Sequence, residues 1–327
     1  MSNQERDPVR SIVRVIRENT SFLLCLHRSP DGDSIGSSLA LARALTKLGK
    51  KATVVSHDPV PSVYAFLPGI DSIQPPDPQA GPWEVALLLD CGSLERTGSA
   101  KAMVETAQVV VNVDHHETNS GFGDINWVDP TRAAAGQMVL EILEALPEAV
   151  DSQQATCLYA AMATDTGFFS FGNTSSSVHT QAARLIEMGA CPEIISRNLN
   201  ENRSLAGLKL LGLALGSLEV LEGGLVAGMS LARADLEKWQ ASSEDLDGIV
   251  NYARSLSGVE VGFLLVEENP DRVKVGLRSR TVDVGQVASR LGGGGHPNAA
   301  GAMAAGSLSE VYSRVMDQLR EALASEG

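Results

Sequence analysis

The chain has 327 residues, 43 % hydrophobic and 20 % charged, a composition typical of a soluble globular protein with room for two domains. Acidic residues outnumber basic ones by 40 to 26, and the net charge of −14 argues against a protein that binds long nucleic acids or anionic membranes through a basic surface. Because only 4 % of the residues are aromatic, we do not expect an extended base-stacking surface.

The cysteines and the amino terminus indicate the cellular compartment. The four cysteines are widely separated and form no CxxC pair, which disfavours a structural zinc site and a disulfide framework. The first ten residues lack the apolar stretch of a signal peptide, and no apolar run approaches the roughly 20 residues that span a bilayer. We therefore expect a cytoplasmic protein with reduced thiols and no membrane partner.

In the first half of the chain, short apolar runs alternate with segments of helical periodicity. Continuous apolar runs of this kind are typical of a parallel sheet that is covered on both faces. The expected fold class is α/β, with a doubly wound, mostly parallel sheet whose ligands gather at the carboxyl ends of the strands. The patterns predict strands at 22–26, 52–56, 85–89 and 109–113, and helices at 34–48, 133–146, 153–163, 178–188 and 192–199.

The second half of the chain changes character after about residue 200 and predicts a smaller α+β domain. We expect a first domain over 10–190, a linker over 191–205 and a second domain over 206–327. The patterns predict strands at 218–221, 225–230, 259–266 and 273–277, and helices at 205–216, 246–256, 284–290 and 309–324.

Acids and histidines follow the apolar runs of the first half, where the predicted strands end. Each acid alone fits a helix cap or a turn, but in a parallel sheet the strand ends face one crevice. Clustered carboxylates repel one another unless a cation lies among them. The residues concerned are His27, Asp31, Asp33, Asp90, Asp114, His115, His116 and, after the helix at 153–163, Asp165.

This set of side chains predicts a site for divalent metal ions. Mixed imidazole and carboxylate ligands suit Mn²⁺, with Fe²⁺, Co²⁺ and Zn²⁺ as alternatives and Mg²⁺ less suited. Two ions that share a carboxylate would clamp a phosphoryl group and generate hydroxide from water.

Five segments carry a resemblance to a known family. HRSPDGDSIGSS, LLLDCGSLERTG, NVDHHETN and MATDTGFF are similar, in this order, to the four motifs of the DHH phosphoesterase superfamily. GGGGHPNAAG is similar to the glycine-rich signature of the DHHA1 domain. From about residue 10 to its end, the chain resembles stand-alone DHH–DHHA1 proteins of the bacterial oligoribonuclease and 3′-phosphoadenosine 5′-phosphate (pAp) phosphatase type.

The resemblance implies a role for each residue of these motifs. One metal ion would be bound by His27 and Asp31, the other by Asp33, His115 and Asp165, and Asp90 would bridge the two. The expected catalytic residues are Asp90 and His116. Of these, His116 would contact the scissile phosphate, while Asp114 would orient its neighbours. In the second domain, the resemblance implies substrate binding by Arg278, Arg280, Gly293, Gly294, Gly295 and His296.

The charge near these second-domain residues supports an anion-binding role. Residues 272–290 contain five basic residues and one acid, a local charge of +4 in a chain of −14. The glycine run itself fits either a flexible loop or a backbone that approaches an anion closely. Arg272 and Lys274 also fit a solvated strand face.

Two further signals in the first half have two interpretations each. Phe168, Phe169 and Phe171 follow Asp165 closely and fit either core packing or the stacking of a base. Arg96, in the segment after Asp90, fits either a contact to phosphate or a surface position.

The expected activity is hydrolysis of short RNA oligonucleotides to mononucleotides, of pAp to AMP, or of both, by attack of a metal-bridging hydroxide. A phosphodiesterase for cyclic di-AMP or linear dinucleotides is the alternative, and the intact motifs disfavour a non-catalytic nucleotide-binding protein. The expected partners are two divalent ions, with Mn²⁺ favoured, and a short RNA, a dinucleotide or pAp, but no long nucleic acid. A homodimer is one of the assemblies left open.

Overall fold

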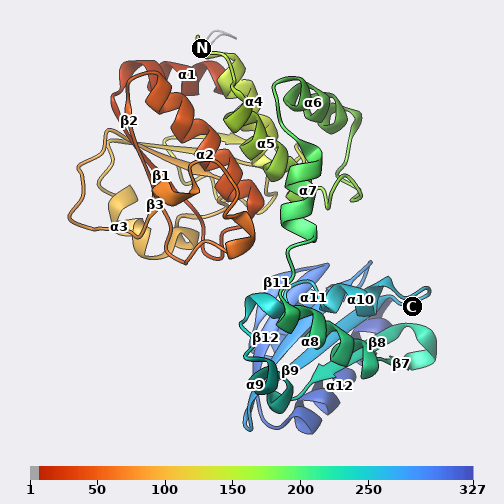
Figure 1. Ribbon diagram of the computed structural model, residues 1–327. Coiled ribbons are helices and arrows are strands. Elements are labelled where there is room, and N and C mark those ends of the chain that lie inside the picture. Colours follow the sequence, from red (N-terminus) through yellow and green to blue (C-terminus); the bar gives the residue numbers. More distant parts are fainter. Residues whose placement is uncertain (1–6, 327) are drawn as a thin grey trace. The chain divides into compact units, whose positions relative to one another are not determined.

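In the computed structural model, which describes residues 7–326, the chain divides into two compact units, the first ending at Asn202 and the second beginning at Arg203 (Figure 1). The division falls within the range 191–205, where we expected a linker. Helix α7 (Pro192–Asn200) lies in the same range. Each unit contains its own sheet.

The first domain is built on a six-stranded parallel sheet in the order β3-β2-β1-β4-β5-β6. The winding direction reverses between β1 and β4, which are neighbours in the sheet but not in the sequence. This reversal point is where open α/β sheets bind ligands, and it confirms the predicted doubly wound α/β fold. The strands are β1 (Ser21–Cys25), β2 (Lys51–Val55), β3 (Ile73–Gln74), β4 (Val85–Leu89), β5 (Val109–Asp114) and β6 (Ile125–Val128).

Alternate residues of each strand face two separate cores, because successive side chains of a strand point to opposite faces. Phe22 and Leu24 of β1 belong to a large core shared with several helices, whereas Leu23 and Cys25 belong to a smaller one on the other face, near α3 (Lys101–Val104). The helices that contribute buried residues to the large core are α1 (Pro8–Glu18), α2 (Gly32–Lys47), α4 (Ala135–Glu144), α5 (Ser152–Asp165), α6 (Ser176–Glu187) and α7.

Two glycines allow α2 to pack closely against α5. A Cβ atom at Gly36 would lie 2.3 Å from the carbonyl oxygen of Cys157, and one at Gly32 would lie 2.5 Å from Thr164 Oγ1. The close packing brings the beginning of α2, which carries two of the predicted metal ligands, to the end of α5, which carries a third.

The second domain contains a mixed six-stranded sheet in the order β11-β12-β10-β9-β8-β7, in agreement with the predicted α+β domain. Strands β8 and β9 are parallel and the other pairs are antiparallel. The strands are β7 (Glu219–Leu221), β8 (Val226–Leu231), β9 (Val261–Asn269), β10 (Arg272–Ser279), β11 (Gly294–His296) and β12 (Ala299–Ala305). The helices are α8 (Leu205–Gly216), α9 (Arg233–Trp239), α10 (Val250–Ser255), α11 (Val284–Arg290) and α12 (Leu308–Glu326).

The glycine run near the carboxyl end forms part of an edge strand rather than a flexible loop. Gly294–His296 pair with β12. Gly293, directly before this strand, and Gly295, within it, are tightly enclosed. A Cβ atom at Gly293 would lie 2.1 Å from the carbonyl oxygen of Gly301, and one at Gly295 would lie 2.6 Å from that of Ala299. Glycine is therefore required here by the close approach of two strands.

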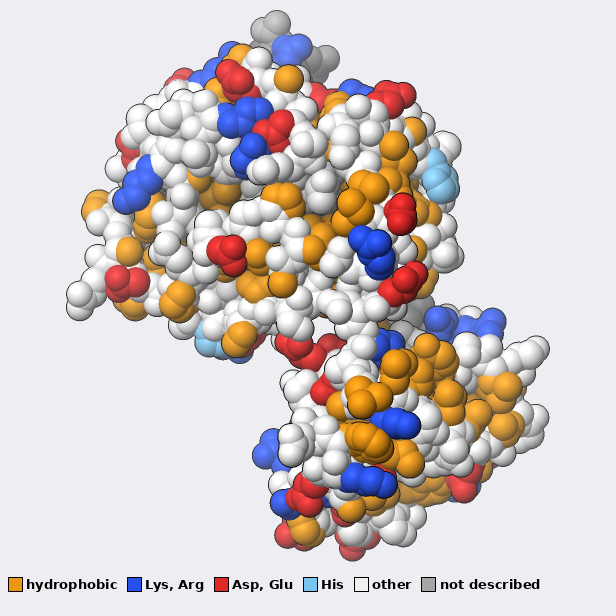
Figure 2. All heavy atoms as spheres, in the orientation of Figure 1, with side chains coloured by type: hydrophobic (Ala, Val, Ile, Leu, Met, Phe, Trp, Pro, Cys, Tyr) orange, Lys and Arg blue, Asp and Glu red, His pale blue; other side chains and the backbone are white. Residues whose placement is uncertain are grey.

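Helix α8 is apolar on nearly all sides, and part of this apolar surface is exposed. Leu205 is 67 % exposed and Leu208 is 52 % exposed. Figure 2 shows hydrophobic side chains gathered on the face of the second domain that carries α8. Among residues 7–326, no helix combines the length and apolar composition that crossing a bilayer requires.

Candidate metal centre

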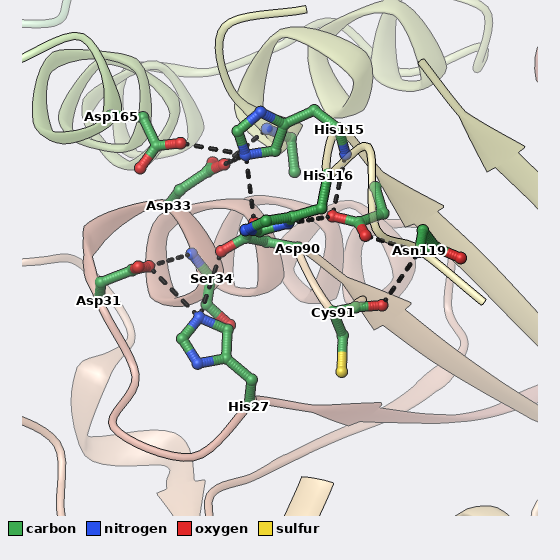
Figure 3. A network of polar contacts seen from close by, with 12 residues as sticks. His27, Asp31, Asp33, Ser34, Asp90, Cys91, His115, His116, Asn119 and Asp165 are labelled. Carbon is green, nitrogen blue, oxygen red and sulfur yellow. Dashed lines mark hydrogen bonds and ion pairs between the residues drawn. The ribbon is translucent and has the colours of Figure 1, made fainter. Parts of the chain in front are cut away.

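The polar side chains predicted from the strand ends converge at the carboxyl edge of the first sheet. His27 follows β1, Asp90 follows β4, and His115 and His116 follow β5, all of which are adjacent strands. Asp165 ends α5 on the same side. Figure 3 shows these side chains pointing toward one another.

Asp90 lies at the middle of the cluster and is 2 % exposed. Its Oδ2 atom is 3.2 Å from His27 Nε2, and its Oδ1 atom is 3.3 Å from His115 Nε2 and 3.4 Å from His116 Nδ1. Burial alone would raise the pKa of Asp90, but the contacts to His115 and His27 lower it below its usual range. The backbone of Asp90 has a φ of +55°, a strained conformation for a residue with a side chain.

The ligand atoms of the cluster form three overlapping groups, in each of which they lie within 4.8 Å of one another. The groups are His27, Asp31 and Asp90; Asp33, His115 and Asp165; and Asp90, His115 and His116. The third group joins the first two, because Asp90 belongs to the first and His115 to the second.

Two buried atoms in this cluster fit a metal ion better than a hydrogen-bond network. Within the described part of the chain, Asp90 Oδ1 and His115 Nε2 are buried and have no hydrogen bond of acceptable geometry. Buried polar atoms without partners are rare and call for an explanation such as a bound ion. Three imidazoles with several carboxylates suit Mn²⁺, Fe²⁺ or Zn²⁺, so the residues present fit divalent metal binding.

His27 is held in an orientation that aims Nε2 at the cluster. Its Nδ1 atom lies 2.7 Å from the carbonyl oxygen of Arg28 and donates to it, and Nε2 lies 3.6 Å from Asp31 Oδ1. Burial alone would lower the pKa of His27, but the carboxylates of Asp31 and Asp90 raise it to about 10. A backbone acceptor on the far ring nitrogen is the usual way in which a protein orients a metal-binding histidine.

Asp33 is fully buried and accepts hydrogen bonds from the beginning of α4. Its Oδ2 atom accepts from the N–H of Ala135 at 2.5 Å, and its Oδ1 atom accepts from the N–H of Gly136 at 2.8 Å and from Ser37 Oγ at 3.0 Å. A helix amino terminus favours a carboxylate, but burial and the nearby charges of Asp165 and Asp90 raise the pKa of Asp33 well above its usual range.

His115 connects Asp33 with Asp165. Its Nε2 atom lies 3.1 Å from Asp165 Oδ2 and 3.8 Å from Asp33 Oδ2. Burial alone would lower the pKa of His115, whereas Asp165 and Asp90 raise it to about 11. Burial, with the charge of Asp90, raises the pKa of Asp165 to about 6. A cation among these groups would relieve the repulsion between their carboxylates.

Asp114 lies behind the two histidines and belongs to none of the three ligand groups. Its Oδ1 atom accepts from His116 Nδ1 at 2.8 Å and from the N–H of His115 at 2.9 Å. Its Oδ2 atom accepts from Asn119 Nδ2 at 2.5 Å. Asp114 therefore orients its neighbours, and it raises the pKa of His116. We had not singled out Asn119, although it stands in the same motif.

Arg96 lies beside the cluster, with Nη2 3.3 Å from His27 Nδ1. Its backbone carbonyl accepts from the N–H of Arg28 at 2.7 Å, so the segment after β4 is tied to the segment after β1. Arg96 is thus half-buried beside the cluster, and its contact to a phosphate stays a prediction.

The predicted substrate-binding residues of the second domain lie on β10, just after β10, directly before β11 (Gly293) and on β11. Arg278 is half-buried, and its Nη1 atom donates to the carbonyl oxygen of Leu277 at 2.8 Å. Burial and the nearby guanidinium of Arg254 lower the pKa of Arg278. Arg280 is exposed, and its Nε atom donates to the carbonyl oxygen of Val259 at 2.9 Å. Gly294, Gly295 and His296 are exposed on β11.

Arg254 is a residue that sequence reasoning missed. Its Nε atom is buried and has no hydrogen-bond partner among the described residues. A buried guanidinium nitrogen beside a second guanidinium favours an anion, and the carboxylate of Asp247 is one negative charge already near Arg278. Arg254 lies on α10, far from the motifs in the sequence, so only the fold brings it to Arg278.

Comparisons with known proteins identify the family. Residues 21–162 match the DHH family, N-terminal domain, and residues 225–325 match the DHHA1 domain. The chain is 36 % identical over 306 residues, 93 % of this chain and 90 % of the relative, to the bifunctional oligoribonuclease and PAP phosphatase NrnA of Thermus thermophilus. This protein belongs to the DHH family.

Other relatives agree with this assignment to the DHH family. The enzyme of the same name from Bacillus subtilis is 26 % identical, over 89 % of this chain and 91 % of the relative. The crystal structure of an exopolyphosphatase-related protein from Bacteroides fragilis has the same fold, with a TM-score of 0.91, 24 % identity and 96 % coverage of each chain. The predicted DHH and DHHA1 resemblance is therefore confirmed.

Proposed function

We propose that this DHH-family protein is a metal-dependent phosphoesterase that hydrolyses short RNA oligonucleotides to mononucleotides and pAp to AMP. The relatives from Thermus thermophilus and Bacillus subtilis carry both activities in their names, and each matches nearly the whole chain. The observation that carries the proposal is the position of Asp90, whose carboxylate lies between two groups of metal-ligating side chains.

The ligand groups support a centre for two divalent ions, with Mn²⁺ as the preferred metal. His27, Asp31 and Asp90 would hold one ion, and Asp33, Asp90, His115 and Asp165 would hold the other. When bound, the ions would stabilise negative charge on the phosphoryl oxygens and lower the pKa of water at the centre.

His116 is the residue proposed to contact the scissile phosphate. Nδ1 of His116 donates to Asp114 Oδ1 at 2.8 Å, and this hydrogen bond fixes the orientation of the ring. Asp114 also raises the pKa of His116, which favours the positively charged imidazolium. A cation in a fixed orientation stabilises the charge that develops on phosphate oxygens in the transition state.

The second domain is proposed to bind a phosphate of the substrate. Arg278 and Arg254 present two guanidinium groups close together, and one of their nitrogens is buried without a partner among residues 7–326. Arg280, His296 and the exposed glycines of β11 are the further candidates for this role.

A turnover series tests the proposed function. We would compare pAp, RNA of two to five nucleotides, RNA of about thirty nucleotides and cyclic di-AMP, each with Mn²⁺. Because a chain of net charge −14 has little long-range attraction for a polyanion, turnover should be highest on pAp and the shortest RNA. Equal kcat/KM for a dinucleotide and the long strand would contradict the proposal, and highest turnover on cyclic di-AMP would favour the alternative activity.

A further inference from the structure

One phenylalanine that follows the metal ligands in sequence is exposed. Among the phenylalanines and tryptophans of residues 7–326, only Phe171 is an exposed residue, at 55 %. Its neighbours Phe168 and Phe169 pack against the large core of the first domain. Core packing therefore explains two members of this aromatic cluster but not the third. An aromatic ring left in water suggests a partner that covers it.

The loop that carries Phe171 is tied to the metal centre by hydrogen bonds. Asn173 Nδ2 donates to the carbonyl oxygen of Asp165 at 3.0 Å and to that of Ala133 at 3.3 Å. Asp165 is in one of the ligand groups. Ala133 lies two residues before Ala135, whose N–H donates to Asp33. The loop thus returns to the centre instead of extending away from it.

The backbone of this loop holds the ring of Phe171 in place. Gly167, Phe168 and Phe169 all have left-handed φ values, of 54°, 55° and 64°, and reverse the chain directly after α5. The ring of Phe171 then lies over Gly167, where a Cβ atom would be 2.4 Å from two ring carbons. This conformation is strained for Phe168 and Phe169, which carry side chains, and strained residues gather at functional sites. Here they support one side of an exposed aromatic ring.

We propose that Phe171 stacks on the nucleobase of the nucleotide whose phosphate lies at the metal centre. The inference rests on the proposed function and adds a residue that recognises the base. Stacking on an aromatic ring suits every base, because each has a π face. A single exposed ring accommodates one base, which agrees with a preference for very short substrates.

Binding of two ligands that differ only in the base tests this role. The Mn²⁺-loaded protein is titrated calorimetrically with AMP and with ribose 5-phosphate. Wild-type protein should bind AMP more tightly, and Phe171→Leu should weaken AMP binding about 5- to 100-fold while ribose 5-phosphate binding stays unchanged. Phe171→Trp should restore the preference. Ile186→Ala, which removes another exposed apolar side chain of the same domain, is the matched control and should change neither affinity.

Two results would overturn the role of Phe171. The first is equal affinity of the wild-type protein for AMP and ribose 5-phosphate. The second is an equal loss of both affinities in Phe171→Leu, which would mean that the ring supports the loop and does not contact the base. The readout is binding, so it stays informative even if wild-type protein hydrolyses none of the proposed substrates, a result that would refute the proposed function alone.

Discussion

At the residue scale, the centre depends on one carboxylate that three histidines share. Asp90 is within 3.4 Å of a ring nitrogen of His27, His115 and His116. Asp114, which directly precedes His115 and His116 in the sequence, is equally buried but contacts these two residues from the other side. The two buried aspartates therefore differ in role: Asp90 lies among the metal-ligand groups, and Asp114 orients His115 and His116. Substitution of each by asparagine, which has the same shape, can separate these roles.

We predict that Asp90→Asn loses tight binding in both ligand groups, because the shared carboxylate contributes charge to each. Asp114→Asn should keep its metal ions and instead lower kcat, since His116 loses the carboxylate that orients it. Metal analysis after gel filtration, together with steady-state kinetics, measures both effects. An Asp90→Asn protein that retains a full complement of metal would refute the central position of Asp90.

At the element scale, the site depends on how closely α2 and α5 approach each other. The backbone of α2 at Gly36 nearly touches that of α5 at Cys157, and the helices carry ligands at their adjoining ends. A side chain placed between them would separate the helices and with them Asp33 and Asp165.

We predict that Gly36→Ala lowers the free energy of unfolding of the first domain by about 1–3 kcal/mol, the usual cost of overpacking. Gly212→Ala is the matched control, because nothing lies within 4 Å of a Cβ atom at this position in α8. That change should stabilise its helix by about 0.5–1 kcal/mol. Urea unfolding followed by circular dichroism gives both values, and a Gly36→Ala protein as stable as wild type would contradict the close packing of α2 and α5.

How far the elements could be predicted from sequence depends on the strength of the local pattern. The predicted bounds of β4, α8 and α11 agree with the structure, because each has a strong apolar run or period. Strand β12 was missed, since Ala299–Ala305 contain only alanine, glycine and methionine. It is a strand because seven of its residues pair with β10. Helix α1, strand β6 and helix α9 were also not predicted.

The site residues, like the helices and strands, divide into those with a local sequence pattern and those that only the tertiary fold brings together. The acids and histidines could be found because most of them directly follow an apolar run or end a helix, and Asp31 and Asp33 lie in the segment after one such run. The sequence could not show that the N–H groups of Ala135 and Gly136 hold Asp33. Nor could it show that the guanidinium of Arg254 lies near Arg278. Backbone donors have no sequence signature, and Arg254 meets Arg278 only through the tertiary fold.

At the scale of the whole molecule, the two domains offer different chemistry. The described metal-ligand groups all belong to the first domain. The paired guanidinium groups belong to the second. Loss of an arginine should therefore change substrate binding and leave the metal content unchanged.

We predict that Arg278→Ala lowers kcat/KM on pAp roughly ten- to a hundredfold, the usual effect of one lost charge-assisted phosphate contact. Arg272→Ala, at the exposed beginning of the same strand, is the control and should have little effect. Steady-state kinetics and metal analysis of both variants measure this. Wild-type kcat/KM in Arg278→Ala would remove the residue from the substrate site.

The most direct test of the account is a metal titration of the whole protein. Protein depleted of metal with a chelator is titrated with Mn²⁺, while bound metal and hydrolysis of pAp and of a diribonucleotide are followed together. We predict no activity without metal, binding of two ions per chain, and activity that rises with their occupancy. Undiminished hydrolysis by the metal-free protein, or full activity with a single bound ion, would contradict the proposed centre built around Asp90.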